Sequence, residues 1–221
     1  MKIEADKAQE TAIRISRILK RFHIEHVIIG GVAVSALVQP RSTKDIDFVI
    51  REDVPKDVLR KIKNNLRRIG WHFEGENTEY HFKRYLFSKS PLEEEIKNYV
   101  ELWVGGVCDT LEFDSELWDR SQILDSLPLP RVEDLLATKM LLERSSADLV
   151  YHAKSQDMED IYNIIVNYNS PTFDWTVIKS SLKKWDKSPE MALNELKMIK
   201  DKNRTHPNFN LGKIRKAMRM S

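Results

Sequence analysis

The feature that most constrains the fold is GGVAVSALVQPRSTKDIDFVI at 30–50, together with the apolar residues directly before it. The segment HVII at 26–29 has the composition of a short buried strand and stops at two glycines, and the compact apolar run at 32–38 predicts a helix behind them. Pro40 ends that helix, and KDIDFVI at 44–50 predicts a second strand. The order strand, glycine turn, helix, strand predicts an α/β-type beginning.

Asp45 and Asp47 lie two residues apart inside the second predicted strand. Because successive strand side chains point to opposite faces, both carboxylates project from one face while Ile46 and Phe48 point into the core. Like charges this close raise each other's pKa unless a cation lies between them, so the pair is suited to bind Mg²⁺. The alternative is a solvated surface pair, because acid-x-acid triplets arise by chance in a chain with 34 acidic residues.

The two glycines, Gly30 and Gly31, point to the same chemistry. A helix N-terminus whose backbone N–H groups are left accessible by glycine is suited to bind an anion. Triphosphate and metal would then meet at one edge of the sheet. A simple tight turn is the alternative, and the motif is not a Walker loop because no Gly-Lys-Ser/Thr follows.

The stretch IIGGVAVSALVQPRSTKDIDFVI resembles the minimal nucleotidyltransferases of the DNA polymerase beta superfamily, whose signature is a Gly-Gly or Gly-Ser turn, a helix and then Asp-x-Asp. It includes the R-x-T-x-D-x-D form seen in many prokaryotic members. The resemblance implies transfer of a nucleoside monophosphate from an NTP to a hydroxyl, with release of pyrophosphate and two Mg²⁺ ions at the site. It implies Asp45 and Asp47 as catalytic metal ligands. The implied nucleotide-binding residues are Gly30, Gly31, Arg41 and Thr43.

Enzymes similar to these use a third carboxylate, from a later strand, that binds the metal near the attacking hydroxyl. The segment YVELWVGG supplies Glu101, at a place where similar proteins often carry Asp, and Glu101 is therefore the candidate third catalytic metal ligand. Glutamate is one methylene longer and would hold the metal differently. Asp109 is the other candidate for the third acid, and an edge-strand surface acid is the structural alternative for Glu101.

Helical spacing predicts helices over 8–22 and after Pro55, and shorter strands follow in WHFE, YHFKRYLF and YVELWVG. LPLP at 127–130 is predicted to be a stiff break, after which helical spacing dominates. We therefore expect an α+β fold. A nucleotidyltransferase catalytic domain with a mixed central sheet would occupy 1–128, and a helical C-terminal domain would occupy 129–221.

The helical half resembles that of the subgroup containing the abortive-infection type IV toxins, whose later motifs place a lysine on one helix and a Lys-Asp element before another. LLATKMLLER offers Lys139 and Arg144, and in AKSQDMEDIY the Lys-Asp element is opened to Lys154-Ser-Gln-Asp157, with Asp160 beyond it. The resemblance implies that Lys139 brings positive charge to the triphosphate. A snorkelling surface lysine is the alternative, and Asp157 is equally suited to be a first-turn acid of its own helix.

Composition narrows the partners only slightly. The formal charge is +2, but basic residues gather at 197–219, which favours RNA or tRNA over a protein or a small molecule as the acceptor. The single cysteine, Cys108, fits a reducing compartment and the apolar stretch at 27–38 is too short to span a bilayer, so we expect a soluble cytoplasmic protein without a membrane partner. The alternative function is a catalytically degenerate nucleotide-binding or toxin–antitoxin interaction module with a cognate antitoxin.

Overall fold

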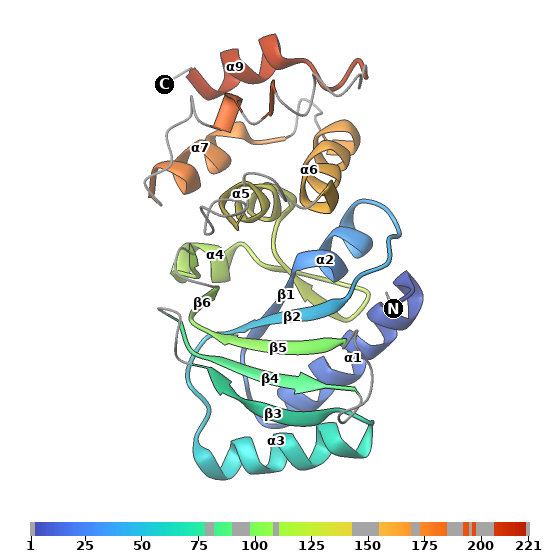
Figure 1. Ribbon diagram of the computed structural model, residues 1–221. Coiled ribbons are helices and arrows are strands. Elements are labelled where there is room, and N and C mark those ends of the chain that lie inside the picture. Colours follow the sequence, from blue (N-terminus) through green and yellow to red (C-terminus); the bar gives the residue numbers. More distant parts are fainter. Residues whose placement is uncertain are drawn as a thin grey trace. The chain divides into compact units, whose positions relative to one another are not determined.

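The computed structural model describes residues 3–77, 82–89, 98–107, 111–142, 155–168, 173–184, 192–194, 196–197 and 206–219. The chain divides into two compact units, Met1–Pro130 and Arg131–Ser221. The first unit combines a mixed sheet with helices, and the described elements of the second unit are all helical, as Figure 1 shows. The expected α+β class with a helical C-terminal region is confirmed.

The first unit is built around a five-stranded sheet in the order β1-β2-β5-β4-β3, in which β2 and β5 are parallel and the other neighbours are antiparallel. The expected mixed sheet is therefore confirmed. The elements of this unit are α1 (Ala5–Arg21), β1 (His26–Ile29), α2 (Gly30–Leu37), β2 (Asp45–Ile50), α3 (Lys56–Arg68), β3 (His72–Asn77), β4 (Arg84–Ser88), β5 (Tyr99–Val104), β6 (Gly106–Val107), β7 (Leu111–Glu112), α4 (Ser115–Asp119), β8 (Gln122–Leu124) and β9 (Leu127–Leu129).

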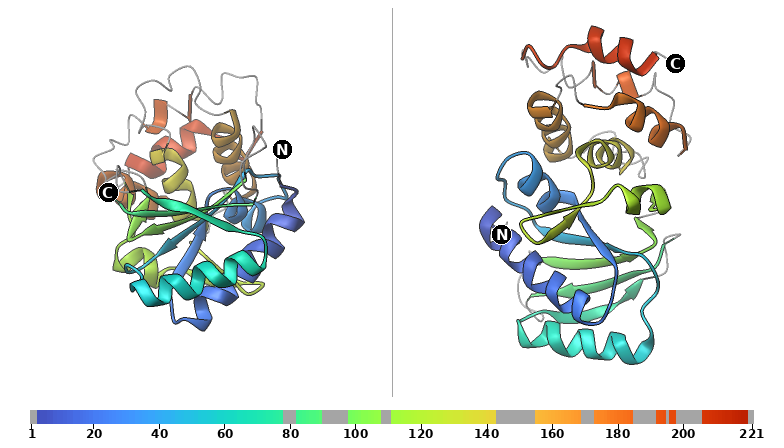
Figure 2. Two further views of the ribbon diagram at one scale, coloured as in Figure 1. Left: turned by 60° about the horizontal axis from the view of Figure 1, so that its bottom comes forward. Right: turned by 180° about the vertical axis from the view of Figure 1, so that it is seen from behind.

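The helices α1 and α3 cover one face of this sheet (Figure 2, left). Each is amphipathic: α1 buries its apolar stripe around Ile15 and Leu19, and α3 buries Leu59, Ile62 and Leu66. Pro55 precedes α3, as expected from its fixed φ. The sheet residues that point toward this core are fully buried: Ile46, Phe48, Tyr85, Phe87, Val100 and Leu102.

The LPLP segment lies where the first unit ends, at Pro130, but its residues form a strand instead of a stiff connection. Leu127–Leu129 forms β9, which pairs with β8 through a tight turn at Asp125 and Ser126, both of which have positive φ. Leu127 and Leu129 are 2% and 0% exposed, and β9 packs against β1. Proline is tolerated in an edge strand, and the leucines on either side of it gain apolar burial, so the alternation of leucine and proline produces a strand.

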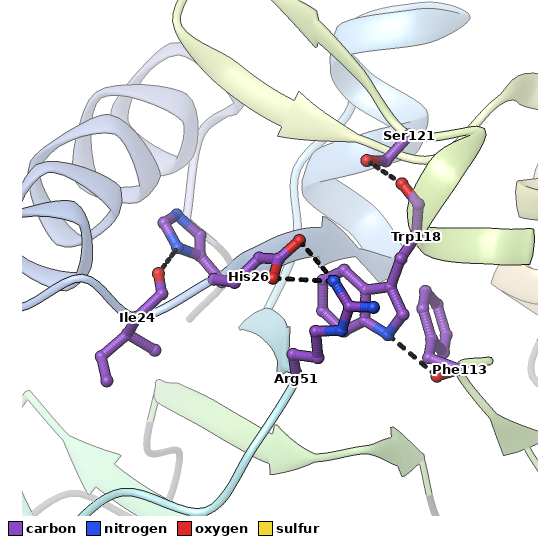
Figure 3. Close-up of polar contacts among 7 residues, drawn as sticks. Ile24, His26, Arg51, Phe113, Trp118 and Ser121 are labelled. Carbon is purple, nitrogen blue, oxygen red and sulfur yellow. Dashed lines mark hydrogen bonds and ion pairs between the residues drawn. The ribbon is translucent and has the colours of Figure 1, made fainter. Parts of the chain in front are cut away.

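His26 connects the start of β1 to α1. Its Nδ1 lies 2.8 Å from the Ile24 carbonyl oxygen and its Nε2 lies 2.8 Å from the Ser16 hydroxyl (Figure 3 shows the first contact). A carbonyl oxygen only accepts, so Nδ1 carries the hydrogen and the neutral ring accepts from Ser16 at Nε2. The pKa of His26 is lowered from 6.5 to about 4, mainly by burial; the hydrogen bond to Ile24 opposes this effect and the nearby charge of Lys20 adds to it.

The loop after β7 is held by a small aromatic cluster, also seen in Figure 3. The indole Nε1 of Trp118 donates to the Phe113 carbonyl oxygen at 2.9 Å, and the Arg51 guanidinium lies 5.9 Å from the centroid of the Trp118 ring. Asp114 caps α4 by accepting from the Leu117 backbone N–H at 2.9 Å.

The second unit contains α5 (Val132–Leu142), α6 (Ser155–Tyr168), α7 (Trp175–Lys184) and α9 (Leu211–Arg219). Within this unit α5 packs against both α6 and α7, and α9 packs against α7. The buried residues of α9, Ile214 and Met218, lie one helical turn apart, and its basic residues face solvent. None of the described helices has the length and apolar composition that a bilayer span requires.

Candidate active site

Asp45 and Asp47 are the first and third residues of β2. Both are half-buried, whereas Ile46 and Phe48 between and after them are 0% exposed on the opposite face. The two carboxylates therefore share one face of the sheet, and the core lies on the other.

Glu101 lies on the neighbouring strand at the same level. β2 and β5 run parallel, and in their register Asp47 is the partner of Glu101 while Asp45 is the partner of Tyr99. Paired residues on adjacent strands point to the same side, so the three acids occupy one face. Burial raises the pKa of the Glu101 carboxyl; the charge of Arg84 opposes this effect and the charge of Asp45 adds to it.

Both oxygens of Glu101 accept hydrogen bonds from neighbours that the sequence interpretation missed. Arg84 Nη1 donates to Oε1 at 3.0 Å, and Trp103 Nε1 donates to Oε2 at 3.0 Å. Trp103 lies two residues after Glu101 on the same strand, so strand periodicity carried a signal for it. Arg84 lies on β4 opposite Trp103, and its place depends on a pairing register that the sequence does not show.

Gly30 and Gly31 allow the start of α2 to approach the residues at 41–47 closely. Gly30 has a φ of +64°, and a Cβ there would lie under 3.0 Å from a carboxylate oxygen of Asp47. A Cβ on Gly31 would meet the Thr43 hydroxyl and the Arg41 guanidinium at similarly short range. Only glycine is compatible with both approaches and with the positive φ. The start of α2 and the end of the motif are thus in contact.

The residues that precede β2 are fixed by main-chain contacts. Thr43 is 7% exposed, its hydroxyl donates to the Asp45 carbonyl oxygen at 3.0 Å, and its backbone pairs with Ile3. Arg41 Nη1 donates to the Ser42 carbonyl oxygen at 3.0 Å, and its backbone N–H lies 3.3 Å from the Ser35 hydroxyl oxygen. The structure therefore brings Gly30, Gly31, Arg41, Thr43, Asp45, Asp47 and Glu101 together in the first unit.

The donor set on this face suits Mg²⁺, a hard cation that proteins usually hold through one or two carboxylates while substrate phosphates and water supply the rest. Asp45 and Asp47 provide two such carboxylates. Across the described parts of the chain, no group of three or more acidic, histidine or cysteine side chains is placed to hold a metal ion. At Glu101 the observed partners are the guanidinium and the indole.

Lys139 belongs to the second unit. The sequence left open that it is a surface lysine whose charged end reaches solvent, and the structure contradicts this alternative. Its side chain is 7% exposed, and its Nζ lies 2.7 Å from Asp157 Oδ1 and 2.9 Å from Asp160 Oδ2. Asp157 lies in the first turn of α6. The predicted role of Lys139 at the triphosphate stays a prediction. Three other candidates, Asp109, Arg144 and Lys154, lie outside the described residues.

No family model and no curated protein sequence matches the chain. Similar solved structures include an antigenic nucleotidyltransferase-like protein from Paracoccidioides brasiliensis, at 17% identity over 83% of this chain and 89% of that one, with a TM-score of 0.47. The antibiotic-resistance factor ANT(2'')-Ia matches at 13% identity over 80% and 91%, with a TM-score of 0.49. The lincosamide antibiotic adenylyltransferase LnuA matches at 16% identity over 67% and 90%, with a TM-score of 0.42.

Proposed function

We propose that the protein is a Mg²⁺-dependent nucleotidyltransferase (EC 2.7.7 type) that moves a nucleoside monophosphate from an NTP to a hydroxyl of an acceptor. The observation that carries the proposal is the contact between the two halves of the motif. Asp45, Asp47 and Glu101 share one face of adjacent parallel strands, and the Asp47 carboxylate lies against Gly30 at the start of α2. Carboxylates for a metal and backbone N–H groups for phosphates therefore lie within one small volume.

Asp45 and Asp47 would hold the metal, and Glu101 would supply the third carboxylate on the side of the attacking hydroxyl. When bound, Mg²⁺ would neutralise charge that develops on the phosphate oxygens and polarise the phosphorus toward attack. Gly30 and Gly31 would present backbone N–H groups to the triphosphate. Arg41 and Thr43, which pack against Gly31, would place a guanidinium and a hydroxyl beside it.

The transfer would be an in-line displacement at the α-phosphorus. The acceptor hydroxyl oxygen forms a bond to this phosphorus while the bond to the bridging oxygen of the β-phosphate breaks, and pyrophosphate leaves with the electron pair. The hydroxyl proton passes to a carboxylate, for which Glu101 is the proposed group. The products are a nucleotidylated acceptor and pyrophosphate.

The test is incubation of the full chain with each α-labelled NTP, Mg²⁺ and total RNA or total protein, with label transfer and pyrophosphate release as readouts. The Asp45→Asn/Asp47→Asn double variant should lose transfer while remaining folded. An exposed acid on α3, Asp57, provides the matched control, and Asp57→Asn should keep full activity. Label that persists in the double variant would remove the assignment.

RNA is the proposed acceptor class, supported by the exposed basic face of α9, which carries Lys213, Arg215, Lys216 and Arg219. Basic side chains bind phosphates without reading sequence, so this face would hold the acceptor but not select it. Among the remaining basic residues of this segment, Lys200, Lys202 and Arg204 lie outside the described part of the chain.

One observation favours a second candidate function, in which the protein binds a nucleotide but transfers nothing. The expected partner of such a module is a cognate antitoxin. Both oxygens of Glu101 are engaged by Arg84 and Trp103. Isothermal titration calorimetry separates the candidates: Mg²⁺-dependent binding of an NTP, with no modified RNA, protein or small hydroxyl compound, would favour the module.

A further inference from the structure

The third acid of the candidate site is bound to a cation that belongs to the chain itself. Arg84 Nη1 lies 3.0 Å from Glu101 Oε1, and the exposed fractions of the two side chains are 18% and 16%. Ion pairs on the surface are weak and exchange easily. This pair is mostly removed from water, so its geometry is held more firmly than that of a surface pair.

The Arg84 guanidinium also lies against an aromatic ring. Its central carbon lies 4.9 Å from the centroid of the Trp103 ring, and the same indole donates its N–H to the other oxygen of Glu101. Arginine can stack its guanidinium plane on an aromatic face while it presents a planar fork to a carboxylate, whereas lysine provides a point charge without the fork. Arg84, Glu101 and Trp103 thus form a closed three-membered contact.

The strand register fixes this contact beside the aspartate pair. Arg84 pairs with Trp103 across the antiparallel strands β4 and β5, and Glu101 pairs with Asp47 across the parallel strands β5 and β2. The guanidinium therefore lies on the same sheet face as Asp45 and Asp47, next to the acid where a second divalent ion would bind.

Removing the partner of a largely buried carboxylate is strongly unfavourable when nothing replaces it. Glu101 will therefore keep Arg84 until another cation takes its place. A divalent ion at Glu101 has to compete with a cation already in contact with it. Asp45 and Asp47 lie one strand further from Arg84, on β2.

We infer that Arg84 is a positioning residue that takes the place of a second cation at Glu101, so that the resting site binds one divalent ion, at Asp45 and Asp47. The inference rests on the proposed function, because it assumes that this face binds metal. It assigns to Arg84 and Trp103 the task of holding Glu101 before substrate arrives. The inference also gives a reason for glutamate at position 101, where similar proteins often carry the shorter aspartate. The longer side chain reaches the Arg84 guanidinium on the neighbouring strand.

The test is direct counting of bound Mn²⁺, a paramagnetic substitute for Mg²⁺, by electron paramagnetic resonance of the full chain without nucleotide. The wild type should bind one Mn²⁺ tightly. Arg84→Met should bind a second, with an affinity at that position raised about tenfold or more once the competing cation is gone. Lys83→Met is the matched control, because Lys83 is the neighbouring residue and pairs with Asp53 and Glu76 instead of Glu101, and it should behave as the wild type.

The outcomes separate the inference from the proposed function. If Asp45→Asn/Asp47→Asn abolishes Mn²⁺ binding but Arg84→Met still binds one ion, the role of Arg84 is wrong and the metal site stands. If the double variant keeps its Mn²⁺, the proposed function itself is wrong. A wild type that binds two ions equally tightly also overturns the inference.

A merely structural role of Arg84 would not produce a gain of metal binding, so the readout distinguishes positioning from stability. Should Arg84→Met fail to fold by circular dichroism, Arg84→Lys and Trp103→Phe carry the test. Lysine keeps the charge without the planar fork, and phenylalanine keeps the ring without the N–H donor. Each should raise the affinity for the second Mn²⁺ above that of the wild type, and no rise in either variant contradicts the inference.

Discussion

Each unit of the protein contains a cluster of acidic side chains beside a basic one, and the two clusters differ in burial. In the first unit, Asp45 and Asp47 are half-buried on a sheet face. In the second unit, Asp160 is 0% exposed and forms an ion pair with Lys139, whose side chain is 7% exposed. Acids two apart on a strand point together toward one face, whereas acids three apart on a helix converge on one neighbour.

The comparison shows that similar residue types can serve different ends. A buried lysine held between two aspartates is suited to fix the packing of α5 against α6. Asp45 and Asp47 are half-buried beside the glycine turn, where the proposed metal and phosphates would bind. We therefore expect charge removal to harm stability in the second unit and activity in the first.

The largest expected effect is on the stability of the second unit. Lys139→Met should lower the free energy of unfolding by about 3–5 kcal/mol, because it leaves the buried Asp160 carboxylate without its lysine. Asp45→Asn should change it by less than about 1 kcal/mol, since its side chain is half-buried. Denaturant unfolding, with hydrogen–deuterium exchange of peptides from α5 and α6, measures both.

Lys183→Met, at an exposed position in the last turn of α7, is the control for loss of one lysine and should be close to neutral. A second variant, Lys139→Met/Asp160→Leu, removes both charges and should recover part of the lost stability. If Lys139→Met unfolds no more easily than Lys183→Met, the stabilising role of this cluster is wrong.

A second difference is expected in acid, and it concerns His26 in the first unit. Its pKa is about 4 in the folded chain and about 6.5 when unfolded, so the fold favours the neutral ring. The stabilisation is complete above about pH 6.5 and is lost as the pH falls through about 4. The loss is on the order of 3 kcal/mol, and it should appear as faster exchange in α1 and β1 peptides.

His26→Asn should flatten this pH dependence between about pH 6.5 and about pH 4, at the cost of lower stability at neutral pH. The control is His23→Asn, because His23 is exposed and has a φ of 58°, a conformation that asparagine also adopts. An unchanged pH profile in His26→Asn would show that another group causes the acid effect.

The acid pair and its setting could be predicted from the sequence because they depend on local rules. Strand periodicity placed Asp45 and Asp47 on one face, and the glycine pair marked the start of the helix. The register that sets Glu101 beside Asp47 was not predictable, since it is decided by how β2 and β5 pair, and Arg84 was missed for the same reason.

Two local interpretations missed part of the structure for tertiary reasons. The prolines of LPLP indicated a stiff connection, but Leu127 and Leu129 are buried and the segment forms a strand that packs against β1 before the first unit ends at Pro130. The alternative of a surface lysine at Lys139 was wrong, because its Nζ lies between Asp157 and Asp160, and its role at the triphosphate stays a prediction. Each outcome depends on contacts between segments far apart along the chain, which periodicity and composition do not contain.

A smaller effect on stability is expected at the glycine turn of the first unit, where a substitution tests the close packing of Gly30 against Asp47. Gly30→Ala should cost about 1–2 kcal/mol through the positive φ alone, and its methyl group would displace the Asp47 carboxylate. Gly75→Ala is the control, because a Cβ there meets nothing within 4 Å and its φ is not positive. Denaturant unfolding gives the first quantity, and Mn²⁺ affinity reports the displacement. Equal effects of both substitutions would contradict the assigned contact.

The smallest expected effect concerns the exposed basic face of α9, and it tests whether the second unit contributes more than packing. If Lys213, Arg215, Lys216 and Arg219 bind RNA, replacing all four by Gln should reduce the slope of log affinity against log salt by about 0.7 for each phosphate that the protein no longer neutralises. Lys183→Gln/Lys184→Gln on α7 removes exposed charge from the same unit without touching α9, so its slope should stay near that of the wild type. A fluorescence anisotropy titration with a single-stranded RNA at several salt concentrations measures the slopes. If the α7 control lowers the slope by as much per charge as the α9 variant, RNA responds to overall charge, and α9 has no specific role in holding the acceptor.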